Sequence, residues 1–239
     1  MIIHKLIAQF LSTQDGAAFY AMQAQDAIRW IEKKGGKLSK GTRVLDLGCG
    51  HGIFGAELMK LGCNVTFSDE QNALFPELAG APFVTINIDG DDLSKFGQYD
   101  LVVCSNVLEH LDKPGQFIQA AAQLLTPNGR LYLSWTNWLS PWGGHDFAPF
   151  HYLGPRLGHS LAEKLTGKKR HHIPYVNLYP TYIGGILKTI RANPLLRVLA
   201  IAPRYYTEFA FIMRIPVVRE FLAWNCALLI ERKTAPKAV

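Results

Sequence analysis

The chain has little of what marks the specialised classes of protein. Its 239 residues contain only four cysteines, at positions 49, 63, 104 and 226, and no two of them form a C-x-x-C pair. This pattern argues against a disulfide framework or a cysteine zinc site, and it favours reduced thiols in a cytoplasmic protein. The 21 glycines and 13 prolines follow no fixed period, which excludes fibrous and repeat architectures.

Long uninterrupted apolar runs are also lacking. The apolar run at residues 1–11 is too short for a convincing secretory signal, and the most apolar later stretch, 195–213, is broken by charged residues and a proline. We therefore expect no membrane-spanning segment. The chain is nevertheless 49% hydrophobic, enough for a full core, and its net charge of +6 favours an anionic partner of some kind.

Strand-like and helix-like segments alternate along most of the chain. The patterns predict strands at 43–47, 64–68, 83–88, 99–105, 130–135, 195–202 and 223–232. They predict helices at 17–34, 53–61, 71–78 and 182–191, and one more around residues 117–124. Five strand–helix units in succession indicate an α/β protein with a parallel sheet and helices on both of its faces.

The most informative segment is VLDLGCGHG, residues 44–52, at a predicted strand-to-helix turn. Its glycines, at positions 48, 50 and 52, let the backbone approach a ligand that a Cβ atom would repel, so we expect a nucleotide-like ligand. Gly50, Gly52 and Gly55 also fit the G-x-G-x-x-G pattern, which leaves a dinucleotide dehydrogenase as an alternative.

Two acidic residues bear on this choice, and the first of them disfavours the dehydrogenase. Asp46 lies just before the first glycine, where it would repel a pyrophosphate but would bind an ammonium group. Asp69 ends the second predicted strand, where an acid can accept hydrogen bonds from ribose hydroxyls.

With these motifs the sequence resembles the class I S-adenosylmethionine-dependent methyltransferases, well over residues 40–135 and loosely elsewhere. VLDLGCGHG is similar to their first motif, and Asp69 matches the acid that ends their second strand. Residues 87–93 resemble the segment after their third strand, residues 99–111 their fourth-strand motif, and residues 125–131 the turn into their fifth strand. The resemblance implies a Rossmann-like, mostly parallel seven-stranded sheet, with the terminal strands as an antiparallel pair at one edge.

The resemblance also implies S-adenosylmethionine as the cofactor and a set of residues around it. It assigns the methionine portion to Asp46, Gly48 and Gly50, the ribose to Asp69, the adenine to Asp89 with Ile88 and Gly90, and the inner wall to Ser105. The adenine assignment stays open because Asp91 and Asp92 lie close by. The full set of predicted cofactor-binding residues is Asp46, Gly48, Cys49, Gly50, Asp69, Glu70, Ile88, Asp89, Gly90, Ser105, Asn106 and His110. For the pair Glu109–His110, support of the pocket and a structural role fit at least as well as direct catalysis.

An irregular segment rich in aromatic residues and histidine, 137–182, follows the fifth predicted strand, and we call it the cap. Between residues 138 and 180 it holds five of the eight histidines of the chain. Because ligands of α/β proteins bind at the carboxyl ends of the strands, we expect the cap to form the acceptor site. His145, Asp146 and His151 are its candidate catalytic residues, since a histidine beside a carboxylate can deprotonate an acceptor hydroxyl.

Other interpretations of the cap stay open. Its histidines could equally make only structural hydrogen bonds within a stacked aromatic loop. Three ligands on such a loop form no recognised metal-binding spacing, so we predict no metal ligands. The basic run at residues 168–172 is typical of a solvated loop and, without a nucleic-acid-binding motif, does not indicate nucleic-acid binding.

We therefore predict a single methyltransferase domain over residues 1–239. It comprises an N-terminal helical segment (1–40), a cofactor-binding core (41–136), the inserted cap (137–182) and a C-terminal helix and strands (183–239). The predicted reaction is O-methylation of a small-molecule, glycan or lipid-like acceptor. The alternative is a non-catalytic S-adenosylmethionine-binding module that acts as a partner or regulator. Residues 1–11 and the arginine-studded stretch 195–221 favour buried core, with peripheral contact at the inner face of a membrane as a minority hypothesis.

Overall fold

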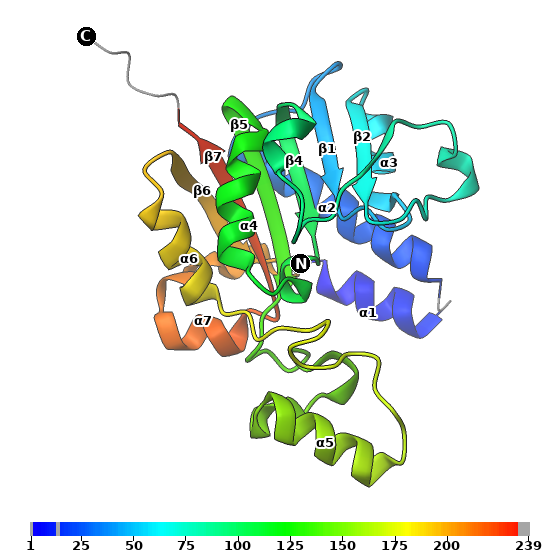
Figure 1. The fold of residues 1–239 in the computed structure, drawn as a ribbon, viewed down its shortest axis with the longest axis vertical. Helices are drawn as coiled ribbons and strands as arrows, with labels where there is room; N and C mark the ends of the chain where they lie inside the picture. Colours follow the sequence, from blue (N-terminus) through cyan, green and yellow to red (C-terminus); the bar gives the residue numbers. More distant parts are fainter. Residues whose placement is uncertain (1, 13–14, 234–239) are drawn as a thin grey trace.

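A seven-stranded sheet forms the centre of the computed structural model, which describes residues 2–12 and 15–233 (Figure 1). The strands are β1 (Arg43–Leu47), β2 (Asn64–Asp69), β3 (Phe83–Thr85), β4 (Tyr99–Ser105), β5 (Leu125–Thr136), β6 (Leu196–Pro203) and β7 (Asn225–Arg232). Their order is β3-β2-β1-β4-β5-β7-β6. β1 to β5 are parallel, and β7 is antiparallel to its neighbours β5 and β6. The predicted mostly parallel α/β sheet with an antiparallel terminal pair is thus confirmed.

Alternation along the strands gives the sheet two apolar faces. In β1, Val44 packs in the cluster on one face, and Leu45 and Leu47 pack in the cluster on the other. In β5, Tyr132 packs in the first of these clusters, whereas Leu131, Leu133 and Trp135 pack in the second. Both faces of a largely parallel sheet must be covered, which explains why the strands are almost continuously apolar.

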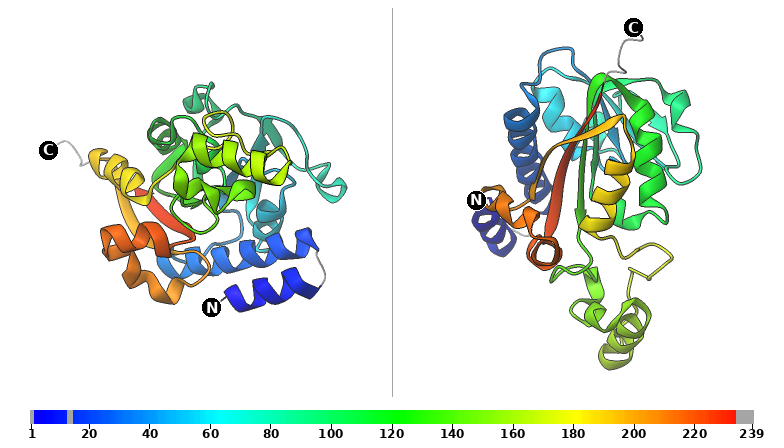
Figure 2. Two further views of the ribbon diagram at one scale, coloured as in Figure 1. Left: turned by 90° about the horizontal axis from the view of Figure 1, so that it is seen from below. Right: turned by 90° about the vertical axis from the view of Figure 1, so that its left-hand side faces the viewer.

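Helices cover both faces, as the edge-on view in Figure 2 shows. The α-helices are α1 (Ile3–Ser12), α2 (Gly16–Gly35), α3 (Ile53–Lys60), α4 (Pro114–Ala121), α5 (Pro155–Thr166), α6 (Ile183–Ala192) and α7 (Pro216–Leu222). α2 and α3 pack on the Val44 face, whereas α4 and α6 pack on the Leu45 face. α1 lies against α2 (Figure 2).

The order in which successive strands are added to the sheet reverses at β1. β2 and β3 lie on one side of β1, and β4 lies on the other. The carboxyl ends of β1 and β4 therefore border the crevice where open α/β sheets bind ligands.

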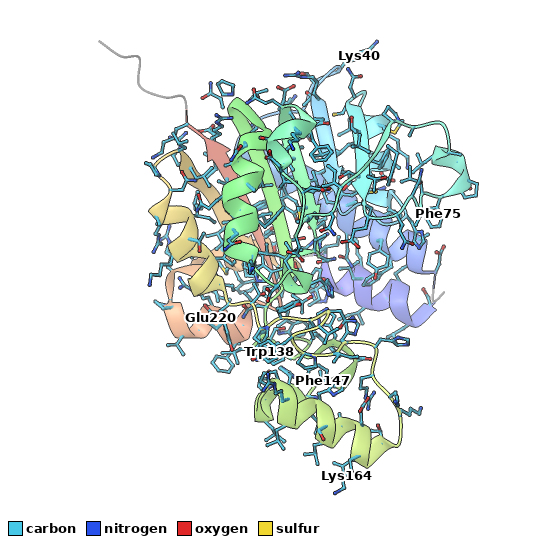
Figure 3. All side chains as sticks on the ribbon, in the orientation of Figure 1. Lys40, Phe75, Trp138, Phe147, Lys164 and Glu220 are labelled. Atoms are coloured by element: carbon cyan, nitrogen blue, oxygen red, sulfur yellow. The ribbon has the colours of Figure 1, made fainter. Side chains whose placement is uncertain are left out.

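The cap lies beyond this carboxyl edge and has a small apolar nucleus of its own. Trp138, Phe147, Ala162 and Leu178 are buried together. Figure 3 shows Trp138 and Phe147 between the lower end of the sheet and α5. The position of the cap next to the carboxyl ends of the strands agrees with the expectation from the sequence.

Helix α5 was not predicted. Its buried residues are Gly158 and Ala162, whereas Leu157 and Leu165 are more than 60% exposed. A Cβ atom at Gly158 would lie 2.1 Å from the carbonyl oxygen of Phe150, so this face of the helix needs a glycine for close packing. An inner face of small residues leaves no apolar stripe for a sequence pattern to detect.

Two predicted elements are shorter than expected. The helix predicted at 71–78 is only a 3₁₀ turn, Pro76–Leu78, because the Asn72 side chain accepts the Leu74 N–H and Pro76 begins the turn. The strand predicted at 83–88 ends at Thr85, and a turn around Asn87 follows it.

Among residues 2–12 and 15–233, no helix combines the length and the apolar character that crossing a bilayer requires.

Candidate cofactor and acceptor site

The glycine-rich turn between β1 and α3 has the backbone that its sequence predicts. Gly48, Gly50 and Gly52 all have positive φ, at 72°, 51° and 81°. A Cβ atom at Gly48 would come within 2.5 Å of a methyl carbon of Val107, whereas one at Gly50 would face open space. Gly50 therefore leaves room above the turn that a ligand can use.

Asp46 lies beneath this turn and is almost completely buried. Its Oδ2 accepts the N–H of Gly55 at 2.8 Å. Burial raises the pKa of this carboxyl to about 7, despite that hydrogen bond. A buried carboxylate with one hydrogen bond favours an incoming cation, as expected for the ammonium of an amino acid.

Asp69 ends β2 beside the same turn. Its Oδ2 accepts the N–H of Gly50 at 2.8 Å, and its Oδ1 accepts that of Glu70 at 2.8 Å. The acid and the turn are thus held to each other.

A cavity of about 690 Å³ opens over the turn and reaches under the cap. This volume lies within the range of small-molecule sites. Predicted site residues that line it are Asp46, Gly48, Cys49, Gly50, Ser105, Asn106, His110 and His145. Predicted residues outside its lining are Asp69, Glu70, Ile88, Asp89, Gly90, Asp146 and His151.

The predicted adenine residues lie in a turn after β3 on the outer side of the site. The Asn87 side chain accepts the N–H groups of Asp89 and Gly90, both at 3.0 Å. Asp89 is exposed, and partial burial next to Asp112 raises the pKa of its carboxyl. This turn lies outside the lining of the cavity, and Asp89 and Gly90 are both exposed.

The predicted catalytic residues separate in space. His145 lines the cavity, but His151 is 1% exposed, and its Nε2 lies 3.0 Å from the carbonyl oxygen of Ser140. The ring of His151 also packs edge-on against Trp138. The structure thus places His151 in the interior of the cap, in the structural position that the sequence left open as an alternative.

Asp146 holds part of the cap together. Its carboxylate accepts the N–H of His171 at 2.7 Å and the Nδ1–H of His172 at 3.0 Å. Burial alone would raise its pKa, but these hydrogen bonds lower it below its ordinary value. Asp146 therefore acts on the cavity through His172, whose ring lines it.

Several cavity residues were missed by sequence reasoning. Phe19, Tyr20 and Gln23 reach the cavity from α2, and His172 reaches it from the far end of the cap. Arg204, at the end of β6, is 5% exposed. Such residues carry no local signal, because each enters the site from an element distant in sequence.

Arg204 brings a positive charge to the wall of the cavity. Its Nη1 donates to Asn106 Oδ1 and to Ser134 Oγ, both at 3.0 Å. Its Nε is buried and has no hydrogen-bond partner among the described residues. A buried guanidinium that makes hydrogen bonds only to neutral groups is a ready partner for a carboxylate.

Glu109 closes the inner end of the cavity. Its Oε1 accepts the N–H of Thr136 at 2.8 Å, and burial raises the pKa of its carboxyl. The adjacent His110 donates from Nδ1 to the carbonyl oxygen of Asn177 in the cap at 2.6 Å. The pair thus connects the end of β4 to the cap and presents the His110 ring to the cavity.

The fold and the cavity define an α/β protein with a small-molecule-sized cavity at its switch point. A family model described as a methyltransferase domain matches residues 19–168. A protein of Mycobacterium marinum named an uncharacterized methyltransferase is 31% identical over 246 residues, which cover 95% of this chain and 92% of that protein.

Solved structures agree in fold. An S-adenosylmethionine-dependent methyltransferase from Mesorhizobium loti is similar with a TM-score of 0.57 at 18% identity, over 86% of this chain and 98% of that chain. Magnesium protoporphyrin IX methyltransferase from Synechocystis, with S-adenosylhomocysteine bound, is similar with a TM-score of 0.53 at 21% identity, over 91% and 86%. The chain belongs to the class I S-adenosylmethionine-dependent methyltransferase family.

Proposed function

We propose that the protein methylates an oxygen atom of a small-molecule, glycan or lipid-like acceptor that binds beneath the cap. The observation that carries this proposal is that one cavity joins the glycine turn to the rings of His110, His145 and His172. Imidazole lone pairs can engage an acceptor hydroxyl, and the rest of the lining leaves room for a ligand beside the turn.

The residues around the turn fit the cofactor. Asp46 and Arg204 offer opposite charges to the ammonium and carboxylate of its amino-acid end, and the unpartnered Nε of Arg204 supports this assignment. Asp69 would hold the ribose, and the Asp89 turn the adenine. S-adenosylmethionine supplies a methyl group that its sulfonium has already activated. The chain therefore contributes mainly alignment and exclusion of water.

The cap histidines differ in their suitability as a base. Burial and the neighbouring His172 and His110 lower the pKa of His145 to about 4, so this ring is neutral at neutral pH and a weak proton acceptor. His172 is held by Asp146 through Nδ1, which leaves Nε2 with a free lone pair. We propose that His145 positions the acceptor oxygen and that His172, oriented by Asp146, engages its hydroxyl.

Calorimetry with S-adenosylhomocysteine tests the cofactor site without knowledge of the acceptor. We expect Arg204→Gln to weaken binding by about tenfold or more, since a charge-assisted hydrogen bond contributes about 1.5–3 kcal/mol. Arg197→Gln is the matched control. Arg197 lies near the start of β6, outside this cavity, and pairs with Glu231 of β7. Equal affinity in both variants would remove Arg204 from the site.

The acceptor is then sought with radiolabelled S-adenosylmethionine and pools of hydroxylated metabolites, glycans and lipids. Methyl transfer to a hydroxyl compound, lost in His172→Gln, supports the proposal. Transfer only to amines or carbon acids would contradict O-methylation.

A further inference from the structure

Three histidines from three separate segments meet at the cavity. His110 ends the 3₁₀ helix Leu108–His110 after β4, His145 begins the 3₁₀ helix His145–Phe147, and His172 lies in the loop after α5. One ring nitrogen from each lies within 4.8 Å of the other two. The ring centroids are 4.5–5.9 Å apart.

The Nδ1 atom of each ring already faces an acceptor. His110 Nδ1 lies 2.6 Å from the Asn177 carbonyl oxygen, and His172 Nδ1 lies 3.0 Å from Asp146 Oδ1. His145 Nδ1 makes a longer contact of 3.4 Å with the Gly143 carbonyl oxygen. Because carbonyl and carboxylate oxygens can only accept, each Nδ1 carries the proton and each Nε2 keeps its lone pair.

This pattern is the one that metal-binding histidines show. A ligating histidine almost always donates its other ring N–H to a carboxylate or a backbone carbonyl, which fixes the tautomer and the ring orientation. Here one ring has the carboxylate and two have carbonyls.

The electrostatics of the cluster also suit a cation. Three protonated imidazoles this close would repel one another, whereas the lone pairs of three neutral imidazoles can converge on one cation. Three imidazole lone pairs beside the Asp146 carboxylate can bind a divalent cation, whereas they would not attract an anion.

We propose that His110, His145 and His172 form a three-histidine site for a divalent transition-metal ion such as Zn²⁺, whose open position faces the cofactor cavity. Three histidines plus an exchangeable oxygen ligand make a typical catalytic zinc site. Tetrahedral Zn–N bonds of about 2.1 Å place the nitrogens about 3.4 Å apart, so separations of at most 4.8 Å must close by no more than about 1.4 Å.

This inference rests on the proposed function and deepens it: the Nε2 of His172 binds the ion, and the ion then engages the acceptor hydroxyl in place of that lone pair. The acceptor is accordingly a hydroxyl compound that can bind the ion. The ion lowers the pKa of the bound hydroxyl, whose proton leaves to solvent. The acceptor oxygen then forms its bond to the methyl carbon as the carbon–sulfur bond breaks, and the electron pair of that bond stays on sulfur.

Metal titration of the full chain tests the site directly. Protein freed of metal by a chelator is titrated with Zn²⁺ in a calorimeter and with Co²⁺ in a spectrophotometer, where tetrahedral Co²⁺ gives intense visible bands. The variants are His145→Asn, His172→Gln and Asp146→Asn. Asparagine suits position 145 because its φ of 49° lies in the left-handed region that asparagine tolerates. His171→Gln is the matched control, since His171 is exposed and adjacent to His172.

We expect one equivalent of metal to bind to the wild-type chain and to His171→Gln. His145→Asn and His172→Gln should weaken binding by about 100-fold or more, and Asp146→Asn, a positioning variant, by about 10- to 100-fold. Absence of saturable binding, or equal affinity in all variants, overturns the site. Circular dichroism of each variant confirms folding.

S-adenosylhomocysteine is titrated into the same metal-free protein as a separate measurement. Normal binding of this ligand together with no metal binding overturns the metal site and leaves the proposed function standing. Metal binding together with no binding of this ligand supports the metal site and overturns the cofactor assignment.

Discussion

Asp46 makes the ligand-free protein less stable at neutral and alkaline pH. The pKa of its carboxyl rises from 3.8 to about 7, because burial disfavours the charged form more than the Gly55 N–H favours it. The folded state therefore binds this proton more tightly than the unfolded state. The contribution of this proton to the free energy of unfolding is fully present below about pH 3.8, falls as the pH rises toward 7, and is lost above that pH. A difference of about three pKa units corresponds to about 4 kcal/mol, the upper limit of the cost at pH 8.

Asparagine at this position removes the charge and keeps a carbonyl oxygen for the Gly55 N–H. We expect Asp46→Asn to raise the Tm of the ligand-free protein by several degrees at pH 8, at most roughly 15 °C, and to change it little at pH 4. Differential scanning calorimetry at both values measures the difference.

The control variant should change the stability at pH 8 in the opposite direction. Asp92 is exposed, and its pKa is lowered by a hydrogen bond from the Ser94 side chain, so Asp92→Asn should be slightly less stable than the wild type at pH 8. An Asp46→Asn protein that is no more stable than the wild type at pH 8, or that gains equally at pH 4, would refute the reasoning.

Three more outcomes follow from single contacts. Gly50→Ala should fold but bind S-adenosylhomocysteine about tenfold more weakly in calorimetry, because its Cβ would enter the cavity. The control Gly41→Ala has equally open surroundings but lies outside the cavity, so it should bind normally. Equal affinity of the two variants would place the cofactor elsewhere. His151→Ala should lower the Tm by roughly 5 °C through the loss of a buried ring, and His145→Asn should leave it nearly unchanged; similar shifts in both would contradict their separate roles. Leu11→Glu should reduce cosedimentation with anionic phosphatidylglycerol vesicles, because Leu11 is 75% exposed on α1; sedimentation equal to that of the wild type would end the hypothesis of membrane contact through this helix.

The parts of the site that were predictable lie next to one another in the sequence. Asp46, Gly48 and Gly50 form one strand–turn unit whose backbone conformations depend on local residue types, so their pattern carries the geometry. Asp69 was predictable because a parallel strand ends at the same edge of the sheet. The strand alternation likewise predicted the sheet, since burial on two faces requires near-continuous apolar runs.

The cap shows where such prediction ends. Its helix α5 buries a glycine and an alanine, so the apolar periodicity that marks other helices is absent. His145 and His151 look alike in the sequence, yet one lines the cavity and the other is buried against Trp138. Orientation inside an irregular loop depends on packing contacts that are distant in sequence.

The sequence alone determined the sheet, the glycine turn and the two acids beside that turn, because local periodicity and turn chemistry specify each of them. Only the tertiary structure decided that Arg204 reaches the cavity and that His110, His145 and His172 converge. The three histidines come from segments far apart in the chain, and only the packing of the cap on the carboxyl edge of the sheet brings their rings together.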